Sequence, residues 1–202
     1  RNKSFFKNTI LKNAFDYAIK NNVAVNCIGL LTSGNVHASL SHVEALIQYA
    51  RMVGAKRLNI HPITDGKDSE RHSAFDLIKK LQNITADVGI GTIGSIGGRY
   101  YGLDRDEHFD RTKKAYDAIL GNTAETVPEE WLSHAYSQGL EDEFIEPVTV
   151  QKKNAARPGD VVIFWDFRED SIRQLADAFI ASNQFIVTTF TEYKKSFAVP
   201  VA

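Results

Sequence analysis

Short runs of β-branched and apolar residues alternate along the chain with longer segments of helical periodicity, and this alternation limits the fold more than any other feature. Five runs have the length and composition of buried strands, at residues 23–31, 57–62, 88–96, 161–167 and 185–191. Helical spacing of apolar residues predicts helices before and between these runs, over residues 9–21, 39–54, 73–83, 110–120, 129–138 and 171–182. The order is typical of βαβ units. It predicts a single three-layer α/β domain in which helices flank a mainly parallel sheet.

Composition narrows the partners and the compartment. With 202 residues, 43% of them hydrophobic, the chain can bury a core of its own. A formal net charge of -1 gives no reason to expect nucleic acid or an anionic membrane surface as a partner. No apolar stretch reaches the roughly 20 residues that cross a bilayer. The one cysteine, Cys27, cannot form an internal disulfide, so we expect a reducing compartment, the cytoplasm. The first residue is Arg1 rather than methionine, and we expect a segment of a longer polypeptide.

Polar and charged residues follow the predicted strands, in the segments 32–37, 64–68, 97–99 and 168–170. In parallel sheets ligands bind beyond the carboxyl ends of the strands, so these segments are expected to converge on one site. Arginine forks match carboxylate and phosphate oxygens, and an aspartate can accept hydrogen bonds from hydroxyl groups. We therefore predict a cationic cleft for a small, hydroxylated, doubly anionic ligand, which contains His37, Asp68, Arg99, Arg105 and Arg168.

Other motifs are weaker. Gly89, Gly91 and Gly94 match the GxGxxG dinucleotide fingerprint, but no helix is predicted to begin after Gly94, so we interpret the segment as a glycine-rich strand. The six histidines lie in separate elements and predict no metal site. Ser33 lacks the GxSxG context of a hydrolase nucleophile.

Four segments carry a family resemblance. Residues 29–37 read GLLTSGNVH, 61–68 read HPITDGKD, 98–106 read GRYYGLDRD and 162–168 read VIFWDFR. They resemble, in this order, the motifs GLLSDGGVH, HAxxDGRD, GRYYxMDRD and VIFFNFR of the cofactor-independent phosphoglycerate mutases. The resemblance extends over nearly the whole chain.

The resemblance implies a two-domain enzyme that interconverts 3-phosphoglycerate and 2-phosphoglycerate in glycolysis. Residues 1–202 then form the substrate-binding domain, inserted into a phosphatase-like domain that this chain does not contain. That other domain carries a nucleophilic serine, which forms a phosphoserine intermediate, and two metal ions, usually manganese. By the same resemblance this chain binds no metal or cofactor itself and is inactive alone. Its partners are the phosphoglycerates and the phosphatase-like domain of the same polypeptide.

The resemblance also assigns roles to individual residues. His37 contacts the substrate, and Asp68 contacts the glycerate hydroxyls and is a candidate proton shuttle. The family's gripping arginines, which hold carboxylate and phosphate, correspond to Arg99, Arg105 and Arg168. Lys67 stands where the family has arginine, so it keeps the charge without the bidentate fork.

One departure concerns the family motif NFRxDR, whose second arginine is Ser171 here. We predict that Ser171 caps the helix over residues 171–182, since serine is a favoured N-cap, and that the lost arginine weakens ligand binding. The loop at residues 32–35 also lacks an aspartate and a glycine of the family pattern. Two alternatives therefore stay open: a non-catalytic phosphoglycerate or sugar-phosphate binding module, and a divergent phosphomutase with another substrate.

Overall fold

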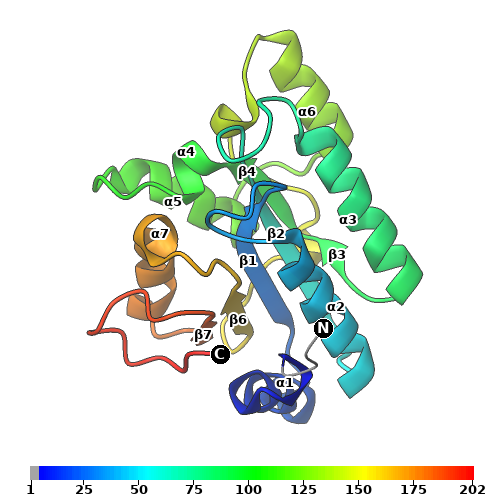
Figure 1. The fold of residues 1–202 in the computed structure, drawn as a ribbon, viewed down its shortest axis with the longest axis vertical. Helices are drawn as coiled ribbons and strands as arrows, with labels where there is room; N and C mark the ends of the chain where they lie inside the picture. Colours follow the sequence, from blue (N-terminus) through cyan, green and yellow to red (C-terminus); the bar gives the residue numbers. More distant parts are fainter. Residues whose placement is uncertain (1–4) are drawn as a thin grey trace.

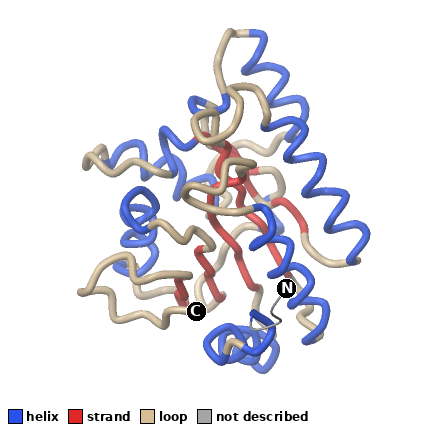
Figure 2. Tube along the Cα trace, viewed as in Figure 1, coloured by secondary structure: helices blue, strands red, loops and turns tan. Residues whose placement is uncertain are grey.

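The computed structural model describes residues 5–202, and its sheet is built from short strands joined by helices (Figures 1 and 2). The strands are β1 (Val25–Leu31), β2 (Leu58–Thr64), β3 (Thr92–Ile93), β4 (Ser95–Gly98), β5 (Val148–Thr149), β6 (Val161–Phe164) and β7 (Ile186–Thr189). The α-helices are α1 (Thr9–Asn21), α2 (Leu40–Val53), α3 (Ala74–Val88), α4 (Arg99–Gly102), α5 (Phe109–Ile119), α6 (Pro128–Ser137) and α7 (Glu169–Ala181). Short 3-10 helices are η1 (Phe5–Lys7), η2 (Asp142–Phe144) and η3 (Lys152–Asn154).

The sheet order is β5-β4-β2-β1-β6-β7, with β3 paired to β2 off this path. Every pair is parallel except β4 with β5, so the predicted mainly parallel sheet is confirmed. All residues of β1 and β2 are buried, as expected for strands covered on both faces. In Figure 1, α2 and α3 lie on one side of the sheet and α5 and α7 on the other, which gives the three layers. None of the helices described is both long enough and apolar enough to cross a membrane.

The predicted strand at residues 88–96 is wrong at its start. Helix α3 continues to Val88, and Gly89 ends it in the left-handed conformation with φ 76°. Gly91 also has a positive φ, of 105°, so the chain cannot run as a regular strand there. Two short strands follow, β3 and β4, and the glycine-rich segment is a helix terminus and a turn rather than one strand.

The prediction that Ser171 caps a helix is also wrong. Helix α7 begins at Glu169, two residues earlier than predicted, and Arg168 occupies the cap position without a side-chain cap bond. Ser171 is the third helical residue, and its side chain is turned toward His37 instead. Glu169 and Asp170 in the first turn carry the negative charge that a helix N-terminus favours, which explains why the helix starts without a serine cap.

The strand order reverses between β1 and β6, and this reversal locates the site. From β1 the chain passes through α2 to β2 on one side, whereas β6 is followed through α7 by β7 on the other. Ligands in such sheets bind where the order reverses, outside the carboxyl ends of the strands. Here the loops after β1 and β6 are tied together, because the backbone amides of Phe167 and Arg168 donate to the carbonyl of His37 at 2.9 and 3.2 Å.

Candidate functional site

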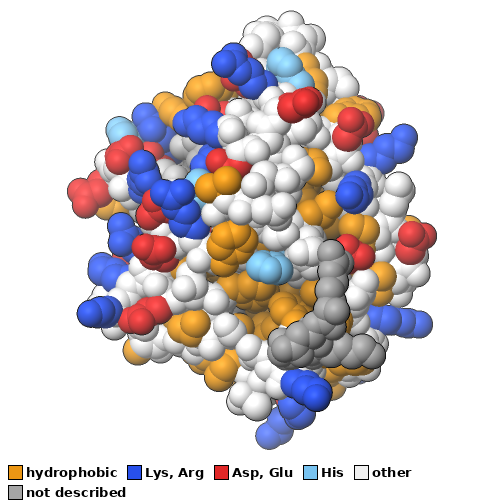
Figure 3. Space-filling model, in the orientation of Figure 1, with side chains coloured by type: hydrophobic (Ala, Val, Ile, Leu, Met, Phe, Trp, Pro, Cys, Tyr) orange, Lys and Arg blue, Asp and Glu red, His pale blue; other side chains and the backbone are white. Residues whose placement is uncertain are grey.

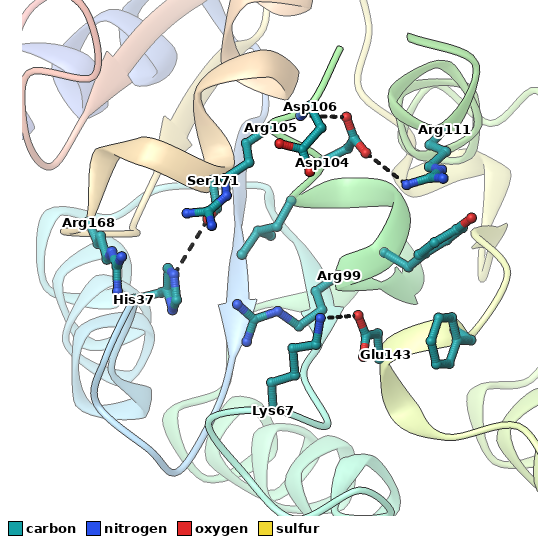
Figure 4. A pocket seen from close by; sticks show the side chains of 13 residues that line it. His37, Lys67, Arg99, Asp104, Arg105, Asp106, Arg111, Glu143, Arg168 and Ser171 are labelled. Carbon is teal, nitrogen blue, oxygen red and sulfur yellow. Dashed lines mark hydrogen bonds and ion pairs between the residues drawn. The ribbon is translucent and has the colours of Figure 1, made fainter. Parts of the chain in front are cut away.

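A cavity of about 620 Å³ opens at the carboxyl ends of the strands. Figure 4 shows its side chains: His37, Arg168 and Ser171 on one side, Arg111 and Glu143 on the other, and Arg99 and Lys67 between them. Six of the seven residues predicted from the sequence line it, namely His37, Lys67, Arg99, Arg105, Arg168 and Ser171. The seventh, Asp68, does not line the cavity but contacts two residues that do.

His37 is held between two acids and a hydroxyl. Its Nδ1 lies 2.6 Å from Oδ2 of Asp68, and its Nε2 lies 3.4 Å from Oγ of Ser171 and 3.8 Å from Oδ1 of Asp170. A carboxylate at Nδ1 favours the tautomer with the proton on that nitrogen, which leaves Nε2 free to accept a hydrogen bond, or to donate one when the ring is protonated. The order Asp68, His37, Ser171 is that of a catalytic triad, but the hydroxyl of Ser171 is shared with Asp170 at 3.3 Å. The contacts therefore fix the ring toward the cavity.

Arg99 is the central cation. It begins α4 directly after β4, and only 9% of it is exposed. Its Nη1 lies 2.5 Å from Oδ1 of Asp65 and 3.3 Å from Oδ2 of Asp68. Burial by itself raises the pKa of Asp65. The side chains of Thr32 and Arg99 and the backbone amide of Asp68 donate hydrogen bonds to the carboxylate, and Arg99 adds its positive charge. Together these interactions outweigh burial and hold the pKa of Asp65 below its usual value. Asp65 is thus ionised and positions the guanidinium.

Arg105 and Arg168 come from different parts of the chain and meet on one carboxylate. Oδ2 of Asp170 lies 2.8 Å from Nη1 of Arg105 and 3.0 Å from Nη2 of Arg168. Burial raises the pKa of Asp170, while the hydrogen bond and charge of Arg168 lower it by more, so the group is ionised at neutral pH. The carboxylate of Asp170 therefore binds these two arginines as the carboxylate or phosphate of a ligand would bind them.

Sequence reasoning missed the opposite wall of the cavity. There Glu143 binds Nζ of Lys67 at 2.5 Å, and Arg111 binds Oδ2 of Asp104 at 3.1 Å. The guanidinium carbon of Arg111 also lies 3.9 Å from the ring centre of Tyr100. Glu143 belongs to η2, and no strand precedes it directly, so the rule of polar residues after strands could not find it. Arg111 lies within a helical pattern, where a charged residue usually only faces solvent.

Five basic and three acidic side chains line the cavity, namely Lys67, Arg99, Arg105, Arg111, Arg168, Asp104, Asp106 and Glu143. Each of the five cations has a carboxylate partner within 3.3 Å. Basic and acidic side chains are accordingly mixed in the upper left of the space-filling view (Figure 3). An anionic ligand would therefore bind these cations by displacing the protein carboxylates that are now paired with them. Such a site favours ligands that offer two anionic groups, because each group replaces an existing partner.

Metal ligands are a separate question. In the part of the chain that the structure describes, no group of three or more His, Cys, Asp or Glu side chains is placed to hold a metal ion. Two of the three acidic residues that line the cavity, Asp104 and Glu143, are already paired with arginine and lysine, so a metal ion would have to compete for their oxygens. The described residues of this chain therefore do not fit a metal centre.

Comparison with known proteins gives consistent results. Residues 1–199 match the family model described as BPG-independent PGAM N-terminus. Proteins named 2,3-bisphosphoglycerate-independent phosphoglycerate mutase are similar to this chain. The protein of Ruthia magnifica is 38% identical, and the match covers 100% of this chain and 42% of that protein. The protein of Clostridium kluyveri is 39% identical, and the match covers 86% of this chain and 35% of that protein. A crystal structure of Leishmania mexicana phosphoglycerate mutase at low cobalt concentration superposes with a TM-score of 0.81 and 23% identity, and covers 90% of this chain and 37% of that one. The chain thus spans about two fifths of the length of these relatives.

Proposed function

The chain belongs to the family of 2,3-bisphosphoglycerate-independent phosphoglycerate mutases, and from this premise we propose that it is the substrate-binding domain of such an enzyme. Residues 1–202 form this domain, and the phosphatase-like domain of the same polypeptide supplies the chemistry. The observation that carries the proposal is the joining of Arg99, Arg105, Arg168 and His37 at one cavity beyond the carboxyl ends of the strands. These groups suit a small ligand with a phosphate and a carboxylate.

In this proposal the complete enzyme interconverts 3-phosphoglycerate and 2-phosphoglycerate through a phosphoserine on the other domain. Splitting the transfer into two covalent steps requires the glycerate to stay bound between them, which is the task of this domain. Arg99, Arg105 and Arg168 grip the anionic groups in exchange for their protein carboxylates. His37 faces the glycerate hydroxyls, and Asp68, which does not line the cavity, is the proposed proton shuttle through its contact with Nδ1 of His37.

The metal ions belong to the other domain in this proposal. Two manganese ions bound there would lower the pKa of the nucleophile and offset charge on the transferring phosphoryl group. The solved relative named above is described with cobalt, and manganese for this protein is part of the proposal. So is a cytoplasmic location, which agrees with the buried free thiol of Cys27.

The proposal predicts that this chain binds 3-phosphoglycerate but does not convert it. Calorimetric titration would measure binding, and an enolase-coupled assay with and without manganese would measure turnover. We expect saturable binding and no turnover above background in either assay condition. Clear turnover by residues 1–202 alone would contradict the division of labour between two domains. Absence of binding, by a folded chain, would contradict the assignment of the cavity.

A second candidate is a phosphomutase or binding module for another small phosphate ester. Two features favour it: lysine at position 67 and serine at position 171, where the family motifs have arginine. Both changes reduce the number of guanidinium forks that face the ligand. A panel of phosphorylated three- to six-carbon acids and sugars, titrated into the chain, would separate the two candidates, because 3-phosphoglycerate should bind most tightly if the first is right.

We expect Ser171→Arg to tighten 3-phosphoglycerate binding by about tenfold. A charge-assisted contact is worth about 1.5–3 kcal/mol. We expect the lower end, because Asp170 competes for the new guanidinium and the first turn of a helix disfavours positive charge. Calorimetry on the wild type and the variant measures the change, and Arg173→Ser on the exposed side of α7 is the matched control. Weaker or unchanged binding by a folded Ser171→Arg chain would mean that the cavity is rebuilt around the serine.

A further inference from the structure

Asp166 is a buried acid beside the cavity that the proposed function leaves without a role. It follows β6 by two residues and is 0% exposed. Its Oδ2 accepts a hydrogen bond from the backbone amide of Leu30 at 3.0 Å, beyond the last residue pair of β1 and β6. Its Oδ1 is buried and has no hydrogen-bond partner among residues 5–202. The carboxyl group is therefore only half satisfied.

The carboxyl group lies directly against the backbone of β1. A Cβ on Gly29 would be 2.3 Å from Oδ2 of Asp166 and 2.6 Å from the ring of Trp165, so only glycine leaves room for both side chains. From the other direction the hydroxyl of Tyr193, itself 2% exposed, donates to the backbone carbonyl of Asp166 at 2.7 Å. Asp166 is therefore packed against β1 through its side chain and bound to the segment after β7 through its backbone.

The charged groups around Asp166 are already paired with one another. Arg99, at the start of α4, gives its ion pairs to Asp65 and Asp68, which follow β2. Tyr193, after β7, is neutral, because burial raises its pKa well above the usual value. On the β1 side, His37 engages Asp68 and lies near Asp170. Among residues 5–202, no neighbour thus offers Asp166 a free positive charge.

A carboxylate without a cation, with one oxygen unsatisfied, is strongly disfavoured in a protein interior, so the group keeps its proton instead. Burial raises the pKa of Asp166 to about 8, against the opposing hydrogen bond from Leu30 and the charge of Arg99. The family motif VIFFNFR has asparagine at this position, which is the uncharged isostere of a protonated aspartate. Both the family motif and the surroundings of Asp166 therefore indicate an uncharged group at this position.

We propose that Asp166 is held as a neutral carboxylic acid beneath the cavity and that its ionisation in alkaline solution weakens anion binding there. Ionisation would place a third carboxylate around Arg99, beside Asp65 and Asp68. The added negative charge opposes an anionic ligand at short range in a medium that screens poorly. The first half of the proposal concerns the protein alone, and the second half rests on the proposed function of the cavity.

Carbon-13 NMR of the chain labelled at the aspartate carboxyl carbon tests the first half without any ligand. The signal that is missing from Asp166→Asn identifies Asp166 in the wild type. We expect this signal to titrate with a midpoint near pH 8, well above the roughly 3.9 of a free aspartate. A midpoint below pH 5 would overturn the proposal, whatever the cavity binds.

Stability gives a second readout of the same proton. Because the folded pKa is raised, the stabilisation is fully present below about pH 4 and is lost as the pH rises toward about 8. The denaturant midpoint of the wild type should therefore fall relative to that of Asp166→Asn across this window. Parallel curves for the two proteins would contradict a neutral acid in the folded state.

Anion titrations test the second half. With sulfate, whose charge is constant over this range, and with 3-phosphoglycerate, we expect the wild type to lose about tenfold in affinity between pH 7 and pH 9 relative to Asp166→Asn. Asp177→Asn on the exposed face of α7 is the matched control and should follow the wild type. Equal pH profiles for the wild type and Asp166→Asn would overturn the coupling. If neither anion binds at any pH, the proposed function fails and the coupling with it, while the NMR result still decides the first half.

Discussion

Replacing Arg99 by methionine is expected to lower the affinity for 3-phosphoglycerate at least a hundredfold. Arg99 is the cation that reaches both Asp65 and Asp68, and it lines the cavity. Truncating one partner of a buried charge pair costs about 2–5 kcal/mol, much of it from the charge left unpaired. Here the carboxylates of Asp65 and Asp68 would remain near an anionic ligand without the cation that lies between them and the cavity. Calorimetric titration of the wild type and Arg99→Met measures the loss.

The same substitution should reduce stability, because it leaves Asp65 buried and without its cation. We expect a loss of about 3–5 kcal/mol in the free energy of unfolding. The double variant Arg99→Met with Asp65→Asn removes the stranded charge and should recover much of the stability without recovering binding. Arg99→Lys keeps the charge and should fall between. If the double variant binds 3-phosphoglycerate as the wild type does, Arg99 is a structural residue and the assignment of the cavity is wrong.

The cluster of polar residues was predicted from one physical rule, and the same rule explains why these residues lie together in the structure. Parallel strands end at one edge of the sheet, so His37 after β1, Asp68 after β2, Arg99 after β4 and Arg168 after β6 had to lie near one another. Strands β1 and β6 were predictable because they are buried along their whole length and consist almost entirely of apolar residues, whereas β2 is equally buried but carries Asn59 and His61. Their roles toward a ligand stay predictions.

What could not be predicted came from segments without a local signal. The edge strand β5 has only two residues, and its antiparallel pairing with β4 depends on the path of the chain after α6. Glu143 reaches the cavity for the same reason: Thr64 donates to the carbonyl of Asp142 at 2.6 Å and fixes η2 at the end of β2. Contacts between residues this far apart in sequence arise from tertiary packing, which periodicity cannot report.

The sequence also could not predict that every cation of the cavity is paired with an acidic side chain. The motifs suggested an open cationic cleft, but Asp65, Asp170, Asp104 and Glu143 occupy its cations in the structure. Such pairing holds flexible side chains near the geometry that a ligand needs, at the cost of competition with it. The net affinity of the cavity is therefore a difference between two sets of charge-assisted contacts. Single substitutions on either side of this balance should have large effects.

Gly34→Ala is expected to lower 3-phosphoglycerate affinity by up to a hundredfold. A Cβ on Gly34 would lie 2.1 Å from the backbone carbonyl oxygen of Asp68 and 2.8 Å from its Cβ. The φ of Gly34 is not in the left-handed region, so the conflict is steric, and the backbone must move by about 1 Å to relieve it. The contact between Asp68 and His37, at 2.6 Å, would be lost or displaced. A charge-assisted contact is worth about 1.5–3 kcal/mol, so losing such a contact to the ligand lowers the affinity by about tenfold to a hundredfold.

The matched control for Gly34→Ala is Gly139→Ala, after α6, where a Cβ would meet nothing within 4 Å. Gly139 has φ 76°, so alanine there costs about 1–2 kcal/mol of stability for backbone reasons alone. Overpacking at Gly34 costs a similar amount, about 1–3 kcal/mol. The two variants should thus be destabilised comparably, as denaturant unfolding measures, while only Gly34→Ala loses affinity in calorimetry. Equal affinities in both would mean that the loop after β1 does not place Asp68 and His37 for the ligand.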